Sequence, residues 1–284
     1  MELFLDCLPC MHKQALEAAY ESTNNIKLQE KIMDDAMKII TNYRKYDYAP
    51  ELCRAVHRIV KQNTNNNDPY RKIKDSDIKE AEKLRDDIRN FTKNQNDILR
   101  GALKASATGN IMDTAILKNL NIKKCLNEEL DKKFKKCDIK NLKSKLKKGN
   151  RILIIGDNSG EGVFDKILIE LLSKKYQVTF AYRSEPIIND ITKREVDIIG
   201  ISDYADVISI GCSAPGALVN EFSHEFKKIF YNSDVVISKG QGNFEALSEI
   251  DRDIYFLLKA KCPRIAKALS VEVGDYVFEL KNSF

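Results

Sequence analysis

The chain has 284 residues, 43% of them hydrophobic and 31% charged, with a formal net charge of +5. This composition is typical of a folded globular protein and excludes an intrinsically disordered one, and no apolar run approaches the ~20 residues that a membrane helix needs. Residues 1–6 lack a basic leader and carry an acid within a short apolar stretch, so we expect no signal peptide. The expected location is the cytoplasm, with no membrane partner.

The N-terminal half has a helical period. From residue 11 to about residue 121 the apolar side chains recur every three or four positions, as Leu28, Ile32 and Ala36 illustrate. Glycine and proline are scarce in this region. We therefore predict an all-helical N-terminal domain that spans residues 1–148.

A basic stretch, residues 123–148, supplies much of the net positive charge. Its hydrophobic residues recur at intervals, which favours amphipathic helices with a solvated basic face. Nucleic-acid binding would require basic residues interleaved with exposed aromatics or a known module, and neither is present. No nucleic-acid partner is expected.

The seven cysteines form an odd, scattered set, which is typical of free thiols or metal ligands in a reducing compartment. Cys7 and Cys10 have the Cys-x-x-Cys spacing of metal ligands, and Cys53 and His57 could complete a site if two helices pair. The pair is therefore a candidate accessory metal site. The alternative is that these cysteines are plain buried thiols.

After Gly149 the pattern changes to short apolar runs separated by amphipathic segments. Five of these runs read as buried parallel strands, and they cover residues 151–155, 177–181, 206–210, 234–237 and 254–258. Strand–helix alternation predicts an α/β fold. We expect a Rossmann-like three-layer α/β/α domain with a mainly parallel sheet over residues 149–284. In such sheets ligands bind beyond the carboxyl ends of the strands.

The first two strands are followed by candidate metal ligands. Asp157 and Asn158 follow the first strand in a glycine-rich loop, and Asp190 lies beyond the second strand. Carboxylate and amide oxygens are hard donors of the type that Mg²⁺ or Mn²⁺ prefers. Two alternatives stay open: Asp-Asn-Ser-Gly is also ordinary turn chemistry, and Asp190 could cap a helix that begins near Ile191.

The later strands are followed by lysines and small residues. Lys239 lies between the fourth strand and a glycine-rich loop, and Lys259 and Lys261 follow the fifth strand. A point charge beside bare backbone N–H groups suits a phosphate. The segment lacks the Walker A spacing, so it does not indicate a P-loop. A lone lysine is usually solvated, but acids, glycines and lysines recur at these strand ends.

Several of these segments together resemble the damage-control phosphatases, a family first catalogued as DUF89, in its short archaeal and bacterial branch. The motifs are Gly-Asp-Asn-Ser-Gly-Glu at 156–161, Pro-Ile-Ile-Asn-Asp at 186–190, Ser-Lys-Gly-Gln-Gly-Asn-Phe-Glu at 238–245 and Leu-Leu-Lys-Ala-Lys-Cys-Pro at 257–263. Upstream, the resemblance includes residues 7–10, 68–71 and 109–113, so it covers nearly the whole chain.

The resemblance implies a helical domain on a Rossmann-like domain, with a divalent metal at their junction. It implies metal binding by Asp157, Asn158 and Asp190. Contacts to the substrate phosphate are implied for Glu161, Lys239, Gln241, Asn243 and Lys259. Gly242 stands where related sequences often have alanine, and Gln241 and Glu245 differ from the eukaryotic branch, so its substrate specificity does not transfer.

The predicted activity is metal-dependent hydrolysis of a phosphomonoester of a small, possibly damaged metabolite such as a sugar phosphate. Asp157 and Asp190 are the predicted catalytic residues, with Mg²⁺, Mn²⁺, Co²⁺ or Ni²⁺ as cofactor. Water is the preferred nucleophile, and either aspartate could accept its proton. A phospho-aspartate route through Asp157 is the alternative, although the class that uses it has Asp-x-Asp, and residue 159 here is serine.

Rival functions come from other classes. The same loops would serve a non-catalytic binding protein for a phosphometabolite or nucleotide, or a nucleotide-dependent transferase. Carboxyl methyltransferase activity has been ascribed to part of the eukaryotic branch, but this chain has no G-x-G-x-G loop after the first strand. Metal-stimulated turnover separates the phosphatase from the binding protein. No oligomeric state is predicted.

Overall fold

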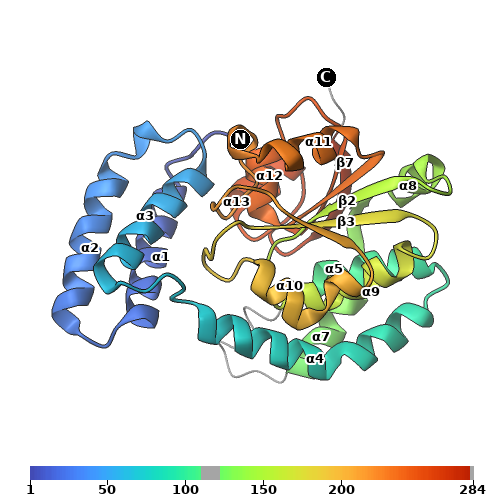
Figure 1. The fold of residues 1–284 in the computed structure, drawn as a ribbon, viewed down its shortest axis with the longest axis horizontal. Coiled ribbons are helices and arrows are strands. Elements are labelled where there is room, and N and C mark those ends of the chain that lie inside the picture. The colour runs from blue at the N-terminus through green and yellow to red at the C-terminus, as the bar shows by residue number, and fades with distance from the viewer. Residues whose placement is uncertain (110–121, 282–284) are drawn as a thin grey trace.

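The computed structural model describes residues 1–109 and 122–281. Its described helices, in chain order, are α1 Cys7–Ser22, α2 Ile26–Thr41, η1 Tyr43–Lys45, α3 Ala49–Thr64, α4 Arg71–Lys93, α5 Ile98–Thr108, α7 Ile122–Asp131, α8 Ile139–Lys145, α9 Glu161–Leu172, α10 Lys193–Ile199, η3 Ile201–Asp203, η4 Val219–Glu221, α11 His224–Asn232, α12 Gln241–Leu247 and α13 Pro263–Leu269. Helices α1 to α3 form a separate group at the left of Figure 1.

The strands form one sheet of seven in the order β1-β7-β6-β5-β2-β3-β4. They are β1 Phe134–Cys137, β2 Arg151–Ile155, β3 Gln177–Tyr182, β4 Asp206–Ser209, β5 Val235–Lys239, β6 Ile254–Lys259 and β7 Tyr276–Lys281. Every pair is parallel except β6 with β7, which is antiparallel. The predicted α/β fold with a mainly parallel sheet and an N-terminal helical region is therefore confirmed.

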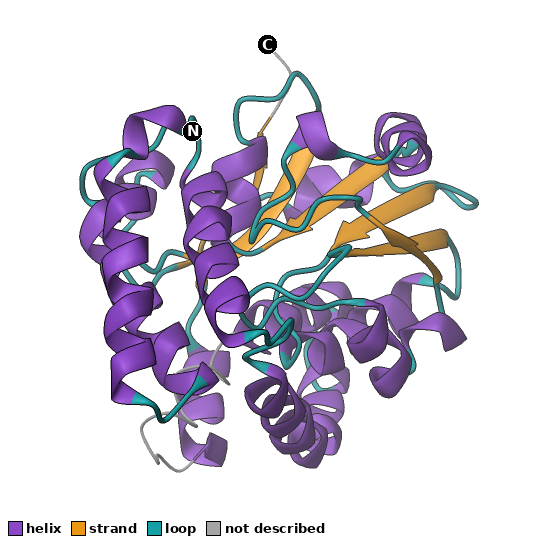
Figure 2. Cartoon of the chain, turned by 60° about the vertical axis from the view of Figure 1, so that its left-hand side comes forward, coloured by secondary structure: helices purple, strands orange, loops and turns teal. Residues whose placement is uncertain are grey.

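The sheet is covered by helices on both faces (Figures 1 and 2). Strand β2 shows why: Ile152 and Ile154 belong to one apolar cluster, whereas Leu153 and Ile155 belong to another. Successive side chains of a strand point to opposite faces, so an uninterrupted apolar strand needs cover on both sides. Strands β2 to β6 run in one direction, and the loops after β2, β3 and β6 face α1 and α3 across a cleft.

The first three helices have apolar clusters of their own, one of which includes Met11, Ala36 and Val56. Helices α4 and α5 instead contact α9 and pack on the sheet. The strand β1 also comes from the N-terminal half of the chain, and it pairs with β7. The division into residues 1–148 and 149–284 stays a prediction.

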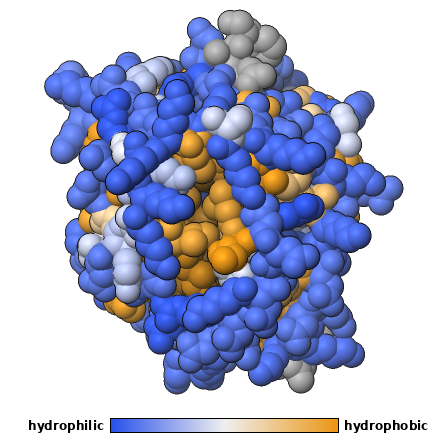
Figure 3. Space-filling view, turned by 90° about the vertical axis from the view of Figure 1, so that its right-hand side faces the viewer, coloured by the Kyte–Doolittle hydropathy of each residue, from blue (hydrophilic) through white to orange (hydrophobic). Residues whose placement is uncertain are grey.

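The basic stretch contains α7, β1 and α8, so a short strand lies between the expected amphipathic helices. In the part of the chain that the structure describes, no helix is long and apolar enough to cross a bilayer. Figure 3 shows the face at the right of Figure 1, which is mainly hydrophilic around one apolar hollow. This face is turned away from α1 to α3.

Candidate active site

The loop after β2 and the segment after β3 meet at the carboxyl edge of the sheet. The amide N–H of Ile191 donates to the carbonyl of Asp157 over 2.8 Å, and Asn158 forms an isolated antiparallel bridge with Asp190. The N–H of Ser159 donates to the carbonyl of Asn189 over 2.8 Å. The structure therefore brings together the three predicted metal ligands from two separated segments.

The two aspartates are poorly hydrated: Asp157 is 8% exposed and Asp190 is 3% exposed. Burial raises the pKa of Asp157 well above its usual value, and the nearby carboxylates of Glu161 and Asp190 raise it further. Two buried carboxylates beside an amide oxygen form a site that a hard divalent cation would stabilise. The residues therefore fit the predicted cofactor by their donor chemistry.

A buried arginine positions Asp190. The Nε of Arg183 donates to Oδ1 of Asp190 over 2.8 Å, and a terminal nitrogen of Arg183 donates to Oδ1 of Asn243 over 2.8 Å. Asn243 in turn donates to the carbonyl oxygens of Gly156 and Lys239. One connected network thus ties the loops after β2, β3 and β5. Sequence reasoning did not assign a role to Arg183, although a charge directly after a buried strand was a visible signal.

Asp190 does not cap the next helix, so the alternative that it is a helix-capping residue is excluded. Helix α10 begins at Lys193, and Thr192 caps it together with Glu195, which accepts from the Thr192 amide and hydroxyl. The Asp190 side chain instead accepts a hydrogen bond from Nε of Arg183. This arrangement favours a functional role for Asp190 over ordinary helix capping.

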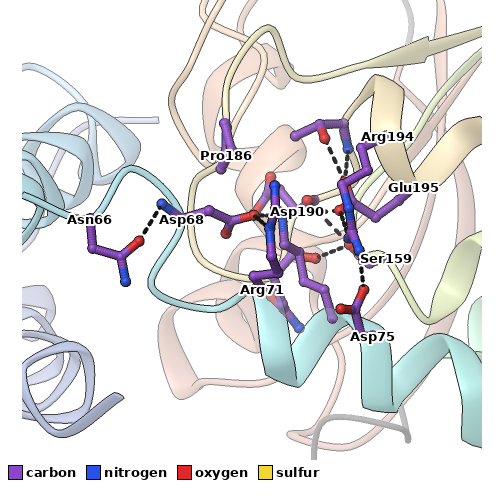
Figure 4. Close-up of polar contacts among 12 residues, drawn as sticks. Asn66, Asp68, Arg71, Asp75, Ser159, Pro186, Asp190, Arg194 and Glu195 are labelled. Atoms are coloured by element: carbon purple, nitrogen blue, oxygen red, sulfur yellow. Dashed lines mark hydrogen bonds and ion pairs between the residues drawn. The ribbon is translucent and has the colours of Figure 1, made fainter. Parts of the chain in front are cut away.

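Ion pairs with the start of α4 also hold the segment after β3 in place (Figure 4). Lys74 is fully buried, and its Nζ lies 2.8 Å from Oδ2 of Asp68 and 3.2 Å from Oε1 of Glu195. Arg194 contacts Asp75 over 2.6 Å and Glu195 over 2.9 Å. These ion pairs connect the start of α4 to α10. The helical region therefore helps to fix the loop that carries the candidate metal ligand.

A cleft of about 640 Å³ opens over the site between α1, α3 and the strand-end loops. Asp157, Asn158 and Asp190 line it, and so does Gln241. Its cations are Lys261, Arg264 and Lys267. A cleft lined by both carboxylates and cations can hold a divalent cation and an anionic substrate together.

Four of the five predicted phosphate-contacting residues do not line this cleft, namely Glu161, Lys239, Asn243 and Lys259. Lys239 is fully buried, and its Nζ lies 2.9 Å from Oε2 of Glu161 and 2.6 Å from Oδ1 of Asp165. Ser106 on α5 also donates to Asp165, over 2.6 Å. Lys239 thus neutralises two buried carboxylates in this structure. Its substrate contact stays a prediction.

Lys259 forms an ion pair with Glu129 of α7 over 2.7 Å, and the hydroxyl of Tyr276 donates to the same carboxylate over 2.6 Å. Burial alone would raise the pKa of Glu129, but hydrogen bonds from Lys132, Lys259 and Tyr276 outweigh burial and lower that pKa to about 2. The resulting stabilisation is complete above the unfolded pKa of ~4.3 and is lost as the pH falls toward 2.

We therefore expect Glu129→Gln to lower the free energy of unfolding by about 1–3 kcal/mol at pH 7, because it removes the acceptor of charge-assisted hydrogen bonds. Denaturant melts between pH 2 and pH 7 measure this. The difference from wild type should shrink below about pH 4. An unchanged difference at pH 3 would show that the ion pair does not contribute.

Gly240 gives the Asp157 carboxylate its space. Its φ is +80°, and a Cβ at this position would overlap both oxygens of Asp157. We expect Gly240→Ala to displace the carboxylate and to lower the free energy of unfolding by about 1–3 kcal/mol, because side chains rarely adopt this backbone conformation. Thermal melts measure the change in stability, and cation titrations measure the displacement of the carboxylate.

The control is alanine at Gly149, which also has positive φ but has open space around it. Equal losses in both variants would show that backbone strain alone accounts for the effect.

Gly242 is also required by packing here, because a Cβ on it would overlap the carbonyl of Pro215. Glycine at this position therefore permits a close approach of the loop after β4. That loop also contains Gly216, whose own Cβ would lie 2.6 Å from the carbonyl of Gly242.

Cys7 and Cys10 line the cleft from α1, together with Cys53 of α3. Burial raises the pKa of the Cys7 thiol, which disfavours the thiolate that a metal would bind. His57 is buried against Tyr70 instead. Among the described residues, no group of three or more His, Cys, Asp or Glu side chains could hold a metal ion. The accessory metal site at Cys7 and Cys10 stays a prediction.

The fold and the site together define an α/β protein with an acidic, oxygen-rich site at the carboxyl edge of its sheet, next to a helical region. The chain belongs to the damage-control phosphatase ARMT1-like family, whose model matches residues 3–277. The resemblance seen in the sequence motifs is thereby confirmed. Of the motif at 109–113, residues 110–113 lie outside the described residues.

Archaeal relatives match the chain over nearly its whole length. It is 33% identical to a damage-control phosphatase of Pyrococcus horikoshii, with 100% of this chain and 99% of that protein aligned. It is 34% identical to an uncharacterized protein of Methanocaldococcus jannaschii, over 96% of this chain and 93% of that one. A crystal structure of a DUF89 family protein from Pyrococcus horikoshii superimposes with a TM-score of 0.91 at 31% identity, covering 99% of this chain and 100% of that one.

Proposed function

We propose that the protein is a metal-dependent phosphatase that hydrolyses phosphomonoesters of small metabolites such as sugar phosphates. The observation that carries this proposal is the convergence of Asp157, Asn158 and Asp190 at the wall of a cleft that also contains cations. Membership of the damage-control phosphatase family supports the reaction class.

Asp157, Asn158 and Asp190 would hold the cation by their side-chain oxygens. When bound, a divalent cation would neutralise the carboxylates and withdraw charge from the phosphoryl oxygens. Arg183 keeps Asp190 oriented through its 2.8 Å hydrogen bond. The Asp190 carboxylate would thus be oriented before a substrate binds.

The cations of the cleft would bind the substrate phosphate. Lys261 and Arg264 follow β6 at the same edge as the acids, and both line the cleft. They would neutralise charge on the equatorial oxygens during transfer to water. Asp157 or Asp190 would accept the proton of that water. We propose these roles in addition to the substrate contacts expected of Lys239 and Lys259, which stay predictions.

The test is a screen of phosphate release from sugar phosphates, nucleotides and an aryl phosphate. Purified protein is first treated with a chelator and then given Mg²⁺, Mn²⁺, Co²⁺ or Ni²⁺ in turn. We expect turnover only with a divalent cation. Binding of phosphometabolites without turnover under any cation would favour the non-catalytic binding protein instead.

A further inference from the structure

A second hollow, which we call the α3 pocket, lies next to the cleft. It has a volume of about 310 Å³, between α3 and the loops that follow β3 and β4. None of its lining residues lines the larger cleft. The loop after β3 separates the two, because Glu185 and Ile187 line the α3 pocket whereas Ile188 to Asp190 line the cleft.

One wall of the α3 pocket is a basic face of α3. Arg54, Arg58 and Lys61 occupy positions i, i+4 and i+7, which align on one side of an α-helix. The opposite side of the helix, with Val56 and Val60, is buried among the N-terminal helices. The helix therefore has no freedom to turn its three cations away from the pocket.

The carboxylates near this wall do not neutralise all three positive charges of α3. Arg54 is paired with Glu221, and Lys61 donates to the carbonyl of Pro186. Arg58 is exposed, and it makes no ion pair or hydrogen bond with the described residues. Among the described residues that line the pocket, Glu185 is the one carboxylate. Burial lowers the pKa of Lys61, so a bound anion would stabilise its charged form.

Amide side chains complete the lining. Gln62, Asn65 and Asn67 contribute N–H donors that the cations alone would not supply. Arginine offers a planar fork that matches two oxygens of a phosphate, and lysine adds a point charge. The pocket volume is at the lower end of the ~300–1,000 Å³ of small-molecule sites. This combination suits a small phosphate rather than a polymer or an apolar ligand.

We propose that the α3 pocket is a second anion site, which binds inorganic phosphate or the phosphate group of a small phosphorylated molecule. Arg58 and Lys61 are its main ligands. The site needs neither a divalent cation nor the candidate active-site acids, so it goes beyond the proposed function and can be tested separately from it.

Calorimetric titration of the intact protein with inorganic phosphate tests the proposal. A chelator is present, and chloride holds the ionic strength constant because contacts between exposed charges are screened by salt. We expect saturable binding to the wild type and a Kd about tenfold or more higher in Arg58→Gln, since a charged hydrogen bond contributes roughly 1.5–3 kcal/mol. Arg44→Gln removes another exposed arginine of the same helical region and should bind as wild type does.

Further measurements locate the phosphate site and identify the class of anion that it binds. Lys61→Met should also raise the Kd of this site, whereas Lys261→Gln in the larger cleft should leave the Kd of this site unchanged. Glycerol phosphate should compete with inorganic phosphate, and the dicarboxylate malonate should compete poorly. The proposal is overturned if wild type does not bind phosphate under chelation, if only Lys261→Gln weakens binding, or if malonate binds as well as phosphate. A failure of metal-stimulated turnover would leave all of these readouts intact.

Discussion

Asp157→Asn and Asp190→Asn are each expected to reduce metal-stimulated phosphate release roughly a thousandfold or more, since a bound cation supplies several kcal/mol to the transition state and 1.36 kcal/mol is a factor of ten. Both side chains line the cleft and lie in contacting segments. Loss of either carboxylate removes one of the two full charges that would hold the cation. Initial rates over a range of Mn²⁺ concentrations measure the effect.

The metal-free stability of Asp157→Asn should not fall. Asp157 is buried beside two other carboxylates that raise its pKa, so a neutral amide relieves repulsion and desolvation. Thermal melts under chelation separate loss of function from loss of fold. Asp6→Asn, at another part of the cleft lining, is the matched control and should keep most of the activity. Turnover at the wild-type rate in either site variant would refute the proposed metal ligands.

Lys239→Met is expected to lower the free energy of unfolding by about 3–5 kcal/mol, because it leaves Glu161 and Asp165 buried without their cation. Burial would lower the pKa of Lys239, yet the carboxylates of Asp165 and Glu161 raise it, so the residue is charged in the fold. The midpoint of thermal unfolding should fall by about 10 °C. Differential scanning calorimetry measures this.

A double variant serves as the control for the buried ion pair. Lys239→Met with Asp165→Asn should be less destabilised than the sum of the two single variants, because residues in one network couple. The alternative role, a direct phosphate contact by Lys239, makes a different prediction. It expects wild-type stability and a raised KM, and that result would contradict the structural role derived from the 2.6 and 2.9 Å contacts.

The central strands could be predicted because they are buried on both faces and read as continuous apolar runs. The predicted runs 151–155 and 254–258 match β2 and β6 to within one residue. Strands β1 and β7 were missed. β1 is a four-residue strand in the basic stretch, and β7 carries Glu279 and Lys281, so neither has an uninterrupted apolar pattern. The pairing of β1 also depends on β7, which lies near the C-terminal end of the described chain.

The residues of the site that could be predicted are those whose type is unusual for the end of a buried strand. The acids after β2 and β3 were visible as polar residues at strand ends, and glycines accompany those after β2. The roles of Arg183, Asp165 and Lys239 were not visible, because a sequence does not show that a charged side chain will be buried or which partner will neutralise it. The contact between α5 and Asp165, through Ser106, joins residues 59 positions apart.

Binding of Mn²⁺ to the metal-free protein tests the central claim most directly, because it reports on the three oxygen-bearing side chains without any substrate. Electron paramagnetic resonance of free Mn²⁺ measures the number of ions bound per chain. We predict one tight site in the wild type, its loss in Asp157→Asn and Asp190→Asn, and its retention in Asp6→Asn. Equal Mn²⁺ binding by all four proteins would contradict the assignment of the cation to this edge of the sheet.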